Sequence, residues 1–263
     1  MKFLVVGDVV GRPGMDRLAE ELPKLIKEYD IGFCIVNGEN SANGKGLRKK
    51  EYDKILEYGA DIITMGNHIY YRKEMLEEYK NLERLAIPAN VTNIVGNKHV
   101  SVQKNGVKVA CINLIGEFGM GTLFEKNTDN PFTVVTDEIK LLKEENTDYI
   151  FVDFHAEATA EKVAMGLYLA ENDVTCMFGT HTHIQTADET LIDNKMAYIT
   201  DVGMTGPMDS VIGLKKEVAL KRFLTKQYAK YDCSENKAIF NAIIVETDDT
   251  TKRAISVERI FLR

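Results

Sequence analysis

The stretch VNGENSANGKG, Val36–Gly46, joins the end of an apolar segment to a glycine-rich polar loop. A P-loop places four residues between its first glycine and its Gly-Lys pair, and then requires Ser or Thr. Here five residues separate Gly38 from Gly44, and Lys45 is followed by glycine, so the stretch does not fit a P-loop. What it does contain is a carboxylate, Glu39, directly after a strand, and this arrangement points towards a metal site.

A second apolar run, FLVV, leads into the polar stretch GDVVGRPG near the N-terminus. Its glycines, Gly7, Gly11 and Gly14, do not fit the G-x-G-x-x-G spacing of a dinucleotide-binding turn. Asp8 nevertheless follows a strand, as Glu39 does, so two carboxylates stand at strand ends.

Short apolar runs rich in Val, Ile and Phe recur along the chain and predict buried strands. These runs are KFLVVG, IGFCIVN, DIITMG, VKVACINLI, DYIFVDF and VTCMFGT. Stretches with helical spacing lie between several of them, at Met15–Tyr29, Leu47–Tyr58, Val134–Glu145 and Ala158–Glu171. We expect Pro23 to kink or break the first helix. Strands alternating with helices predict βαβ units, and hence an α/β fold with a largely parallel sheet.

Three turn signals predict hairpins, at Asn105-Gly106, at Asp193-Asn194 and around Asp248–Thr251. We expect the antiparallel strands of the C-terminal part to build a second sheet. No linker, repeat or low-complexity segment divides the sequence, so residues 1–263 are expected to form a single domain.

Composition narrows the class of protein. Forty acidic against thirty-three basic side chains give a net charge of -7, which disfavours an extended nucleic-acid surface or binding to an anionic membrane. The cysteines lie far apart without a C-x-x-C pair and are expected to be packed thiols of a reducing compartment. They are Cys34, Cys111, Cys176 and Cys233. The N-terminal apolar run is too short for a signal peptide and no segment is long enough to span a membrane, so we expect a soluble, cytoplasmic protein.

Polar clusters follow the predicted strands, and four of the five histidines belong to them. The clusters are Asp8, Gly38–Asn40, Gly66–His68, His155, and the pair His181 and His183. In extended backbone, residues two apart share a face, so both histidines of the pair can enter one cleft. Each cluster alone has a structural alternative, such as a turn role for Asn40 or Asn67. Together at successive strand ends, the clusters favour a site that binds metal ions.

The order Asp, Gly-acid-Asn, Gly-Asn-His, His and Gly-x-His-x-His is similar to that of the calcineurin-like metallophosphoesterase superfamily. More closely, the chain resembles the YmdB-like bacterial phosphodiesterases, from Asp8 to about Gly213. The motifs that carry this resemblance are GDVVGRPG, NGEN, GKGL, GNH, DFHAEAT, GTHTHIQTADE and DVGMTGP.

The resemblance implies a single metallophosphoesterase domain, a four-layer α/β/β/α sandwich with two mixed β-sheets and a dinuclear metal site. One metal ion would be held by Asp8, Glu39, Asn40 and His183. The other would be held by Glu39, Asn67, His155 and His181, with Glu39 as the bridge. Iron is the metal expected, while Mn, Zn, Co or Ni also suit such ligands. A homo-oligomer is expected from the family alone.

The implied activity is hydrolysis of small cyclic nucleotides of the 2',3'-cyclic AMP type, by attack of a metal-bridging hydroxide with His68 as general acid. The chain departs from the superfamily at Val10, where most members carry a histidine ligand. We expect Asn40 to supply the missing ligand. The chain also reads Ile69, Tyr70 and Tyr71 where the family often carries Trp-Asp after Gly-Asn-His, which leaves the orientation of His68 open.

Candidate substrate contacts are Lys45 in the glycine-rich loop, Tyr70 as a stacking partner for a base, and Thr205 in the loop Asp201–Ser210. The alternatives to substrate binding are that the tyrosine is buried in the core and that Lys45 faces solvent. Two other functions remain open: a metal-binding regulatory or scaffolding protein with little turnover, and an oxygen-activating di-iron protein. The second lacks the Glu-x-x-His pairs of helical di-iron sites.

Overall fold

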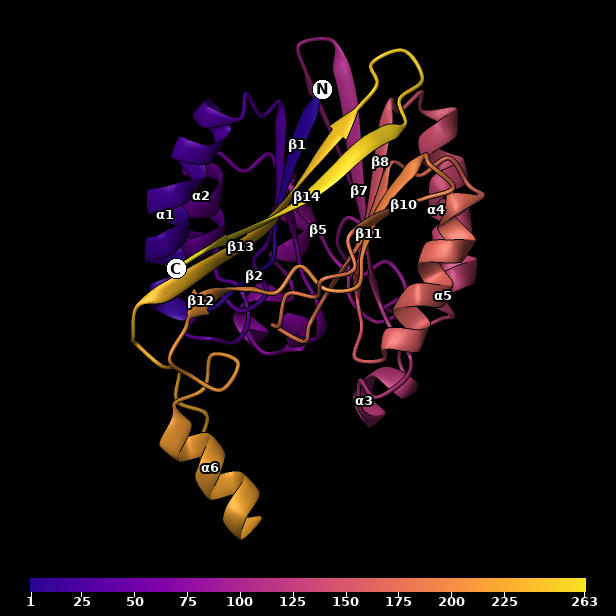
Figure 1. The fold of residues 1–263 in the computed structure, drawn as a ribbon. Coiled ribbons are helices and arrows are strands. Elements are labelled where there is room, and N and C mark those ends of the chain that lie inside the picture. The colour runs from indigo at the N-terminus through magenta and orange to yellow at the C-terminus, as the bar shows by residue number, and fades with distance from the viewer.

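Two mixed sheets lie face to face between two layers of helices in a computed structural model, which describes residues 1–263 without the side chain of Glu125 (Figure 1). Helices α1 (Gly11–Glu28) and α2 (Lys49–Glu57) cover the first sheet. Helices α4 (Pro131–Glu144) and α5 (Thr159–Ala170) cover the second. The four-layer α/β/β/α sandwich with two mixed sheets is therefore confirmed.

The first sheet runs in the order β2-β12-β13-β1-β3-β4-β5, and β14 pairs with β13. Its strands are β1 (Lys2–Val6), β2 (Asp8–Val9), β3 (Phe33–Asn37), β4 (Ile62–Thr64), β5 (Leu85–Ala86), β12 (Met204–Pro207), β13 (Ala238–Thr247) and β14 (Ala254–Leu262). Strands β1, β3, β4 and β5 are parallel, so their carboxyl ends lie at one edge of this sheet.

The second sheet runs in the order β10-β11-β9-β8-β7-β6. Its strands are β6 (His99–Lys104), β7 (Val107–Ile115), β8 (Tyr149–His155), β9 (Cys176–Thr180), β10 (Thr190–Ile192) and β11 (Met196–Ile199). The centre is parallel, from β7 through β8 and β9 to β11, and antiparallel hairpins close both edges. The hairpins predicted at Asn105-Gly106 and Asp193-Asn194 are confirmed.

The C-terminal hairpin is also confirmed, but the expectation that the C-terminal strands build a second sheet holds only for β10 and β11 and is wrong for β13 and β14. Strand β13 lies inside the first sheet, antiparallel to β1 with Leu4 opposite Ile244. The β10–β11 hairpin instead extends the second sheet. The apolar run of β13 is buried on both faces, as a central strand requires, but such a run does not specify which sheet it joins.

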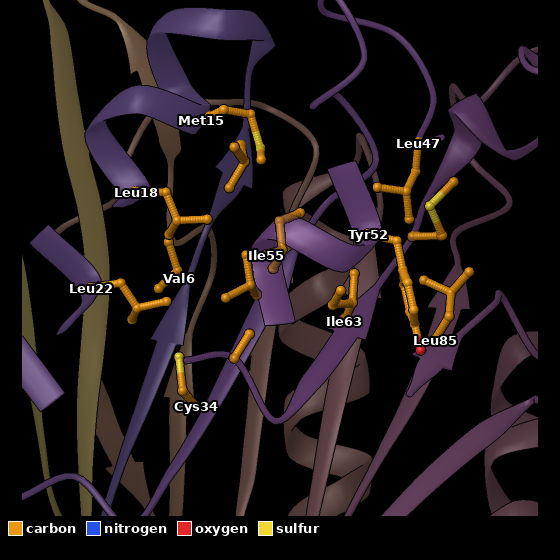
Figure 2. Packing of buried hydrophobic residues seen from close by; sticks show 14 of the residues in the cluster. Val6, Met15, Leu18, Leu22, Cys34, Leu47, Tyr52, Ile55, Ile63 and Leu85 are labelled. Atoms are coloured by element: carbon orange, nitrogen blue, oxygen red, sulfur yellow. The ribbon is translucent and has the colours of Figure 1, made fainter. Parts of the chain in front are cut away.

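Strand β1 shows how alternating side chains fill the apolar layers. Phe3 and Val5 enter the core between the sheets, where the Phe3 and Phe151 rings lie 4.8 Å apart. Leu4 and Val6 point the other way, into the core beneath α1 and α2 that Figure 2 shows. This period of two explains why the strand is apolar throughout.

Helix α1 runs through Pro23 without a break, contrary to expectation, and begins at Gly11 rather than Met15. Pro23 lies on the exposed face, where water can bond the carbonyl that loses its amide donor. The buried side of the helix, with Leu18 and Leu22, stays packed on the sheet and holds the helix together.

The remaining helical segments are short. They are the 3₁₀ turns η1 (Asn67–Tyr70), η2 (Lys73–Met75) and η3 (Tyr79–Asn81), with α3 (Thr122–Glu125) and α6 (Lys216–Thr225). Helix α6 projects away from the two sheets (Figure 1). Among the residues that the structure describes, no helix has the length and apolar character needed to cross a membrane.

All four cysteines are free, and we expect them to react slowly with Ellman's reagent in the native protein at pH 8. Burial raises the pKa of Cys34, Cys111 and Cys176, and it raises that of the half-buried Cys233 to about 11. The reactive thiolate is therefore scarce in the folded chain. Denaturation should release four rapidly reacting thiols, and a fast native phase would contradict this burial.

Candidate metal centre

The polar clusters predicted from the sequence meet between the carboxyl edges of the two sheets. Asp8 follows β1, Glu39 follows β3 and Asn67 follows β4, all in the first sheet. His155 ends β8, and His181 follows β9 in the second sheet. The carboxyl ends of parallel strands are where open α/β sheets hold ligands, and here two such edges face one another.

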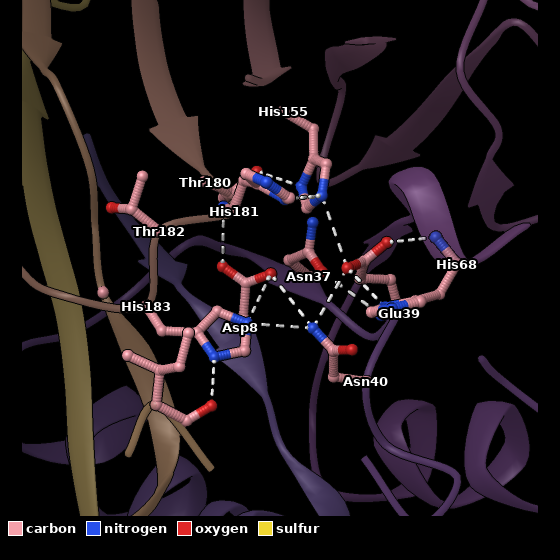
Figure 3. A network of polar contacts seen from close by, with 12 residues as sticks. Asp8, Asn37, Glu39, Asn40, His68, His155, Thr180, His181, Thr182 and His183 are labelled. Carbon is pink, nitrogen blue, oxygen red and sulfur yellow. Dashed lines mark hydrogen bonds and ion pairs between the residues drawn. The ribbon is translucent and has the colours of Figure 1, made fainter. Parts of the chain in front are cut away.

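Asp8, Glu39 and His155 form the centre of this site. They offer ligand atoms that all lie within 4.8 Å of one another, and each residue is fully buried. Figure 3 shows Glu39 placed between His68 on one side and the Asp8 group on the other. Its Oε1 lies 3.3 Å from His155 Nε2 and 3.0 Å from His68 Nδ1.

The carboxylates and His155 of this centre shift one another's pKa. Burial alone raises the pKa of Glu39, but His155 and His68 outweigh it and hold that pKa well below its usual range. Burial disfavours the charged form of His155, yet the Glu39 carboxylate raises its pKa to about 9. Burial raises the pKa of Asp8, although His183 and His155 oppose the shift. A metal cation supplies the same compensating charge without a proton.

Asn40 provides a direct test of whether the residues fit a metal ion. Its Nδ2 lies 3.0 Å from Glu39 Oε1 and 3.1 Å from His183 Nε2. Its Oδ1 is buried and has no hydrogen-bond partner. Nδ2, not Oδ1, faces the Asp8 and Glu39 carboxylates (Figure 3). An orphaned buried carbonyl oxygen is costly in a folded protein, and turning the amide over would aim Oδ1, a ligand atom that hard and borderline cations accept, at the centre. The donor set therefore fits a metal centre.

A second group of donors surrounds His155. Its Nε2 lies 2.9 Å from Asn67 Oδ1 and 3.0 Å from His181 Nδ1. The structure thus brings together all seven ligands predicted from the sequence, in two groups that share Glu39. Gly66 lies against Glu39 and His155, because a Cβ there would stand 2.4 Å from Glu39 Oε2 and 2.5 Å from the His155 ring. Only glycine lets the backbone approach this closely.

The backbone of the His181 and His183 segment differs from our expectation. It is not extended, because β9 ends at Thr180 and the two histidines have φ of 99° and 66°. His181 also donates its backbone N–H to Asp8 Oδ2 at 3.2 Å. His183 Nδ1 donates to the carbonyl of Ile212 at 2.9 Å, which leaves Nε2 facing Asn40 and Asp8. A tight loop therefore aims both rings inward, where a strand was predicted.

This loop is held by an ion pair that our sequence reasoning missed. Lys162 Nζ lies 2.8 Å from Asp201 Oδ2, and both side chains are completely buried. Lys162 also donates to the Thr180 carbonyl, while Asp201 accepts from the backbone and hydroxyl of Thr182. The available signal was the position of Lys162 on the buried face of α5, three residues before Met165.

His68 is oriented by Glu39. Its Nδ1 and its backbone N–H lie 3.0 and 2.9 Å from the two Glu39 carboxylate oxygens. The ring is 22% exposed and its edge faces Tyr71, with the centroids 6.1 Å apart. With Tyr70 two residues after His68, the hydrogen bonds to Glu39 and the ring contact with Tyr71 orient the imidazole.

The three candidate substrate contacts, Lys45, Tyr70 and Thr205, differ in burial and in the groups that they contact. Lys45 is partly exposed, and its ammonium lies over the rings of Tyr71 and Tyr231. Tyr70 is partly buried, turns its hydroxyl to Asn93 and packs against the apolar core beneath the helices. Thr205 is fully buried, and its hydroxyl bonds the backbone of a neighbouring strand. Lys45 and Tyr70 are therefore partly exposed, whereas Thr205 is not accessible to a substrate.

Thr180 connects His155 to a buried carboxylate. Its hydroxyl donates to Asp153 Oδ1 at 2.7 Å and accepts from His155 Nδ1 at 2.8 Å, which leaves Nε2 free for a metal ion. Thr180→Val is expected to lower the free energy of unfolding by about 1 to 3 kcal/mol, because buried polar groups lose a partner. Metal affinity should fall by about 10- to 100-fold, measured by chelator competition.

The control for this change is Thr180→Ser, which keeps the hydroxyl and should retain most of the metal affinity. If the serine and valine variants bind metal equally weakly, the loss comes from packing and not from the hydroxyl.

Residues 4–260 match the model of the YmdB-like protein family. The chain is 42% identical over 263 residues to a 2',3'-cyclic-nucleotide 2'-phosphodiesterase of Bacillus subtilis, covering all of this chain and 97% of that protein. A novel phosphatase from Mycoplasma pneumoniae has a similar structure, with a TM-score of 0.91 at 36% identity over 100% of this chain and 93% of that one. A hypothetical protein from Thermus thermophilus gives 0.87 at 33% identity, over 99% and 98% of the chains. The match extends along nearly the whole sequence, and the chain belongs to the YmdB-like protein family.

Proposed function

We propose that this chain is a dinuclear metal-dependent phosphodiesterase that hydrolyses small nucleoside 2',3'-cyclic phosphates. The observation that carries the proposal is the pair of donor groups that share Glu39, with His68 held on the same carboxylate. The similarity to the Bacillus subtilis phosphodiesterase supports the same reaction class.

One metal ion would be held by Asp8, Asn40 and His183. The other would be held by Asn67, His155 and His181, and Glu39 would contribute to both sites. Bound metal ions supply Lewis-acid activation of water and neutralise the phosphoryl oxygens. Iron is the expected metal, although ligands of this kind also accept Mn, Zn, Co or Ni.

The protein residues account for the other requirement of the reaction, the proton for the leaving group. Water adds to phosphorus, the bond from phosphorus to O2' breaks, and O2' must take a proton to give a nucleoside 3'-phosphate. His68 donates to Glu39 through Nδ1, so its Nε2 is the ring nitrogen available to protonate O2'. A positioned general acid of this kind contributes about 10²- to 10⁴-fold in rate.

His68→Asn tests this assignment. Hydrolysis of 2',3'-cyclic AMP should fall by about 10²- to 10⁴-fold while the metal content per chain stays unchanged, because His68 is not a ligand. The matched control is His99→Asn, since His99 lies on β6, contacts Glu138 of α4 and belongs to neither donor group, so turnover should be unaffected.

The same experiment separates the enzyme from a regulatory or scaffolding protein. A scaffold that retains its metal shell would show little hydrolysis even in the fully metal-loaded wild type, and His68→Asn would change nothing. Normal turnover in the variant would exclude His68 as the general acid and leave the metal centre standing.

A further inference from the structure

A cavity of about 460 Å³ is lined by cationic and aromatic side chains, one of which, Tyr71, contacts the His68 ring. Its cations are Arg12, Lys45, Arg72 and Lys230, and its rings are those of Tyr71 and Tyr231. Two carboxylates also border it, and one of them, Asp232, is paired with Lys215 at 2.6 Å. The lining is therefore positive, in a protein whose net charge is -7.

Lys45 is the central cation of this cavity. Its ammonium lies 5.2 Å from the centroid of the Tyr71 ring and 4.9 Å from that of Tyr231. Among the side chains that the structure describes, no carboxylate lies within ion-pair distance of Lys45 or of Lys230. Burial is the main cause that lowers the pKa of Lys45, the charge of Arg222 lowers it further, and the Glu39 carboxylate opposes the shift. Such a group gains by binding an anion.

The cavity wall is fixed before any ligand enters. Arg72 donates from Nε to the Lys45 carbonyl at 3.1 Å and from Nη2 to the Ala42 carbonyl at 2.5 Å. Gly44 has a φ of 83°, and a Cβ there would stand 2.6 Å from the Tyr231 hydroxyl. The loop Val36–Gly46 is thus clamped between Arg72 and Tyr231, so the lysine is positioned by packing.

The position of the cavity suggests which part of a substrate it receives. Tyr71 lines it and also touches the His68 ring, and the Glu39 charge acts on Lys45. Because His68 protonates the leaving oxygen in the proposed reaction, the ribose lies on the His68 side of the reacting phosphorus. A substituent on the 5' oxygen that extended past Tyr71 would reach the cations of the cavity.

We propose that the Lys45 cavity is a subsite for a phosphoryl group on the 5' oxygen of the nucleoside 2',3'-cyclic phosphate. This inference rests on the proposed function and narrows its substrate class. The preferred substrates carry two phosphates on one ribose: 5'-phosphorylated mononucleotides, or the cyclic phosphate end of a short RNA fragment, where the 5' phosphate is a diester.

The test compares kcat/KM for three substrates: adenosine 2',3'-cyclic phosphate, the same compound with a 5'-phosphate, and a dinucleotide that ends in a 2',3'-cyclic phosphate. The wild type should prefer the phosphorylated substrates by about tenfold or more, as expected for one charged hydrogen bond. If only the compound with a 5'-phosphate is preferred, the natural substrate is a free nucleotide. If the dinucleotide is preferred equally, the natural substrate is the end of an RNA fragment.

Lys230→Gln should bring this ratio of kcat/KM values towards one, because it removes a lining charge and Lys230 is not one of the proposed metal ligands. Lys221→Gln is the matched control, since it removes an exposed charge from α6 outside this cavity and should preserve the ratio. Equal kcat/KM for all three substrates in the wild type would overturn the inference while leaving the proposed function intact.

A binding measurement keeps the subsite testable even if no substrate is turned over, in which case the proposed function itself fails. Adenosine 3',5'-bisphosphate should bind the chelator-treated protein more tightly than adenosine 3'-phosphate, and Lys230→Gln should remove the difference. Equal binding of the two ligands by the wild type overturns the subsite.

Discussion

Glu39→Gln is expected to leave the chain folded but unable to retain its metal ions, and to reduce hydrolysis of 2',3'-cyclic AMP by about 10³-fold or more. The two Glu39 oxygens face donors only: His155 Nε2, His68 Nδ1 and backbone, and the Asn40 amide. Glutamine keeps the shape but turns one acceptor into a donor and removes the shared negative charge. Both donor groups should therefore lose affinity together.

Metal analysis after purification without chelator measures this directly, and two ions per chain are expected in the wild type. A second readout is thermal: metal ions that bind only the folded chain raise its melting temperature, so a chelator should lower it in the wild type and leave it unchanged in Glu39→Gln.

Glu138→Gln is the matched control for this prediction. Glu138 is also buried and also binds a histidine, with His99 Nδ1 2.6 Å away, but it lies outside the centre. The Glu138→Gln variant should be less stable than the wild type but should keep its metal ions. A Glu39→Gln protein that keeps two ions would show that Glu39 is not the shared ligand.

The strands and the ligand residues were predictable because each depends on a local pattern. Apolar runs such as β3 end in a polar residue, and the carboxyl ends of parallel strands meet at one edge wherever the sheet forms. Asp8, Glu39 and His155 therefore converge for the same reason that the fold is α/β. The resemblance to known motifs supplied the pairing of residues with metal ions, which spacing alone did not.

Features that depend on contacts distant in sequence were not predictable in this way. The place of β13 depends on its pairing with β1, about 240 residues away, and its apolar run would fit either sheet. The positive φ of His181 depends on the buried partners behind it, and nothing in Thr-His-Thr-His indicates a left-handed turn. Tyr70 reads as an aromatic beside the site, but its direction is set by Asn93.

Lys162→Met is expected to produce the largest loss of stability, about 3 to 5 kcal/mol, because it leaves Asp201 buried and charged without its partner. Both side chains are inaccessible to solvent, so water cannot replace the ammonium. The loop that carries His181 should also loosen, since Lys162 donates to the Thr180 carbonyl at 2.7 Å. Urea unfolding with and without metal separates the two effects.

A double-mutant cycle with Asp201→Asn determines whether the ion pair itself is responsible. The combined variant carries no buried charge at these two positions, so it should be more stable than the sum of the single losses predicts, by about 1 to 3 kcal/mol of coupling. Lys143→Met provides the exposed comparison, because its ion pair with Asp173 lies in solvent and its removal should change stability by less than about 1 kcal/mol. Additive losses in the cycle would mean that Lys162 acts through packing alone. Coupling together with weakened metal binding would show that a charge pair behind the loop holds the histidine ligands in place.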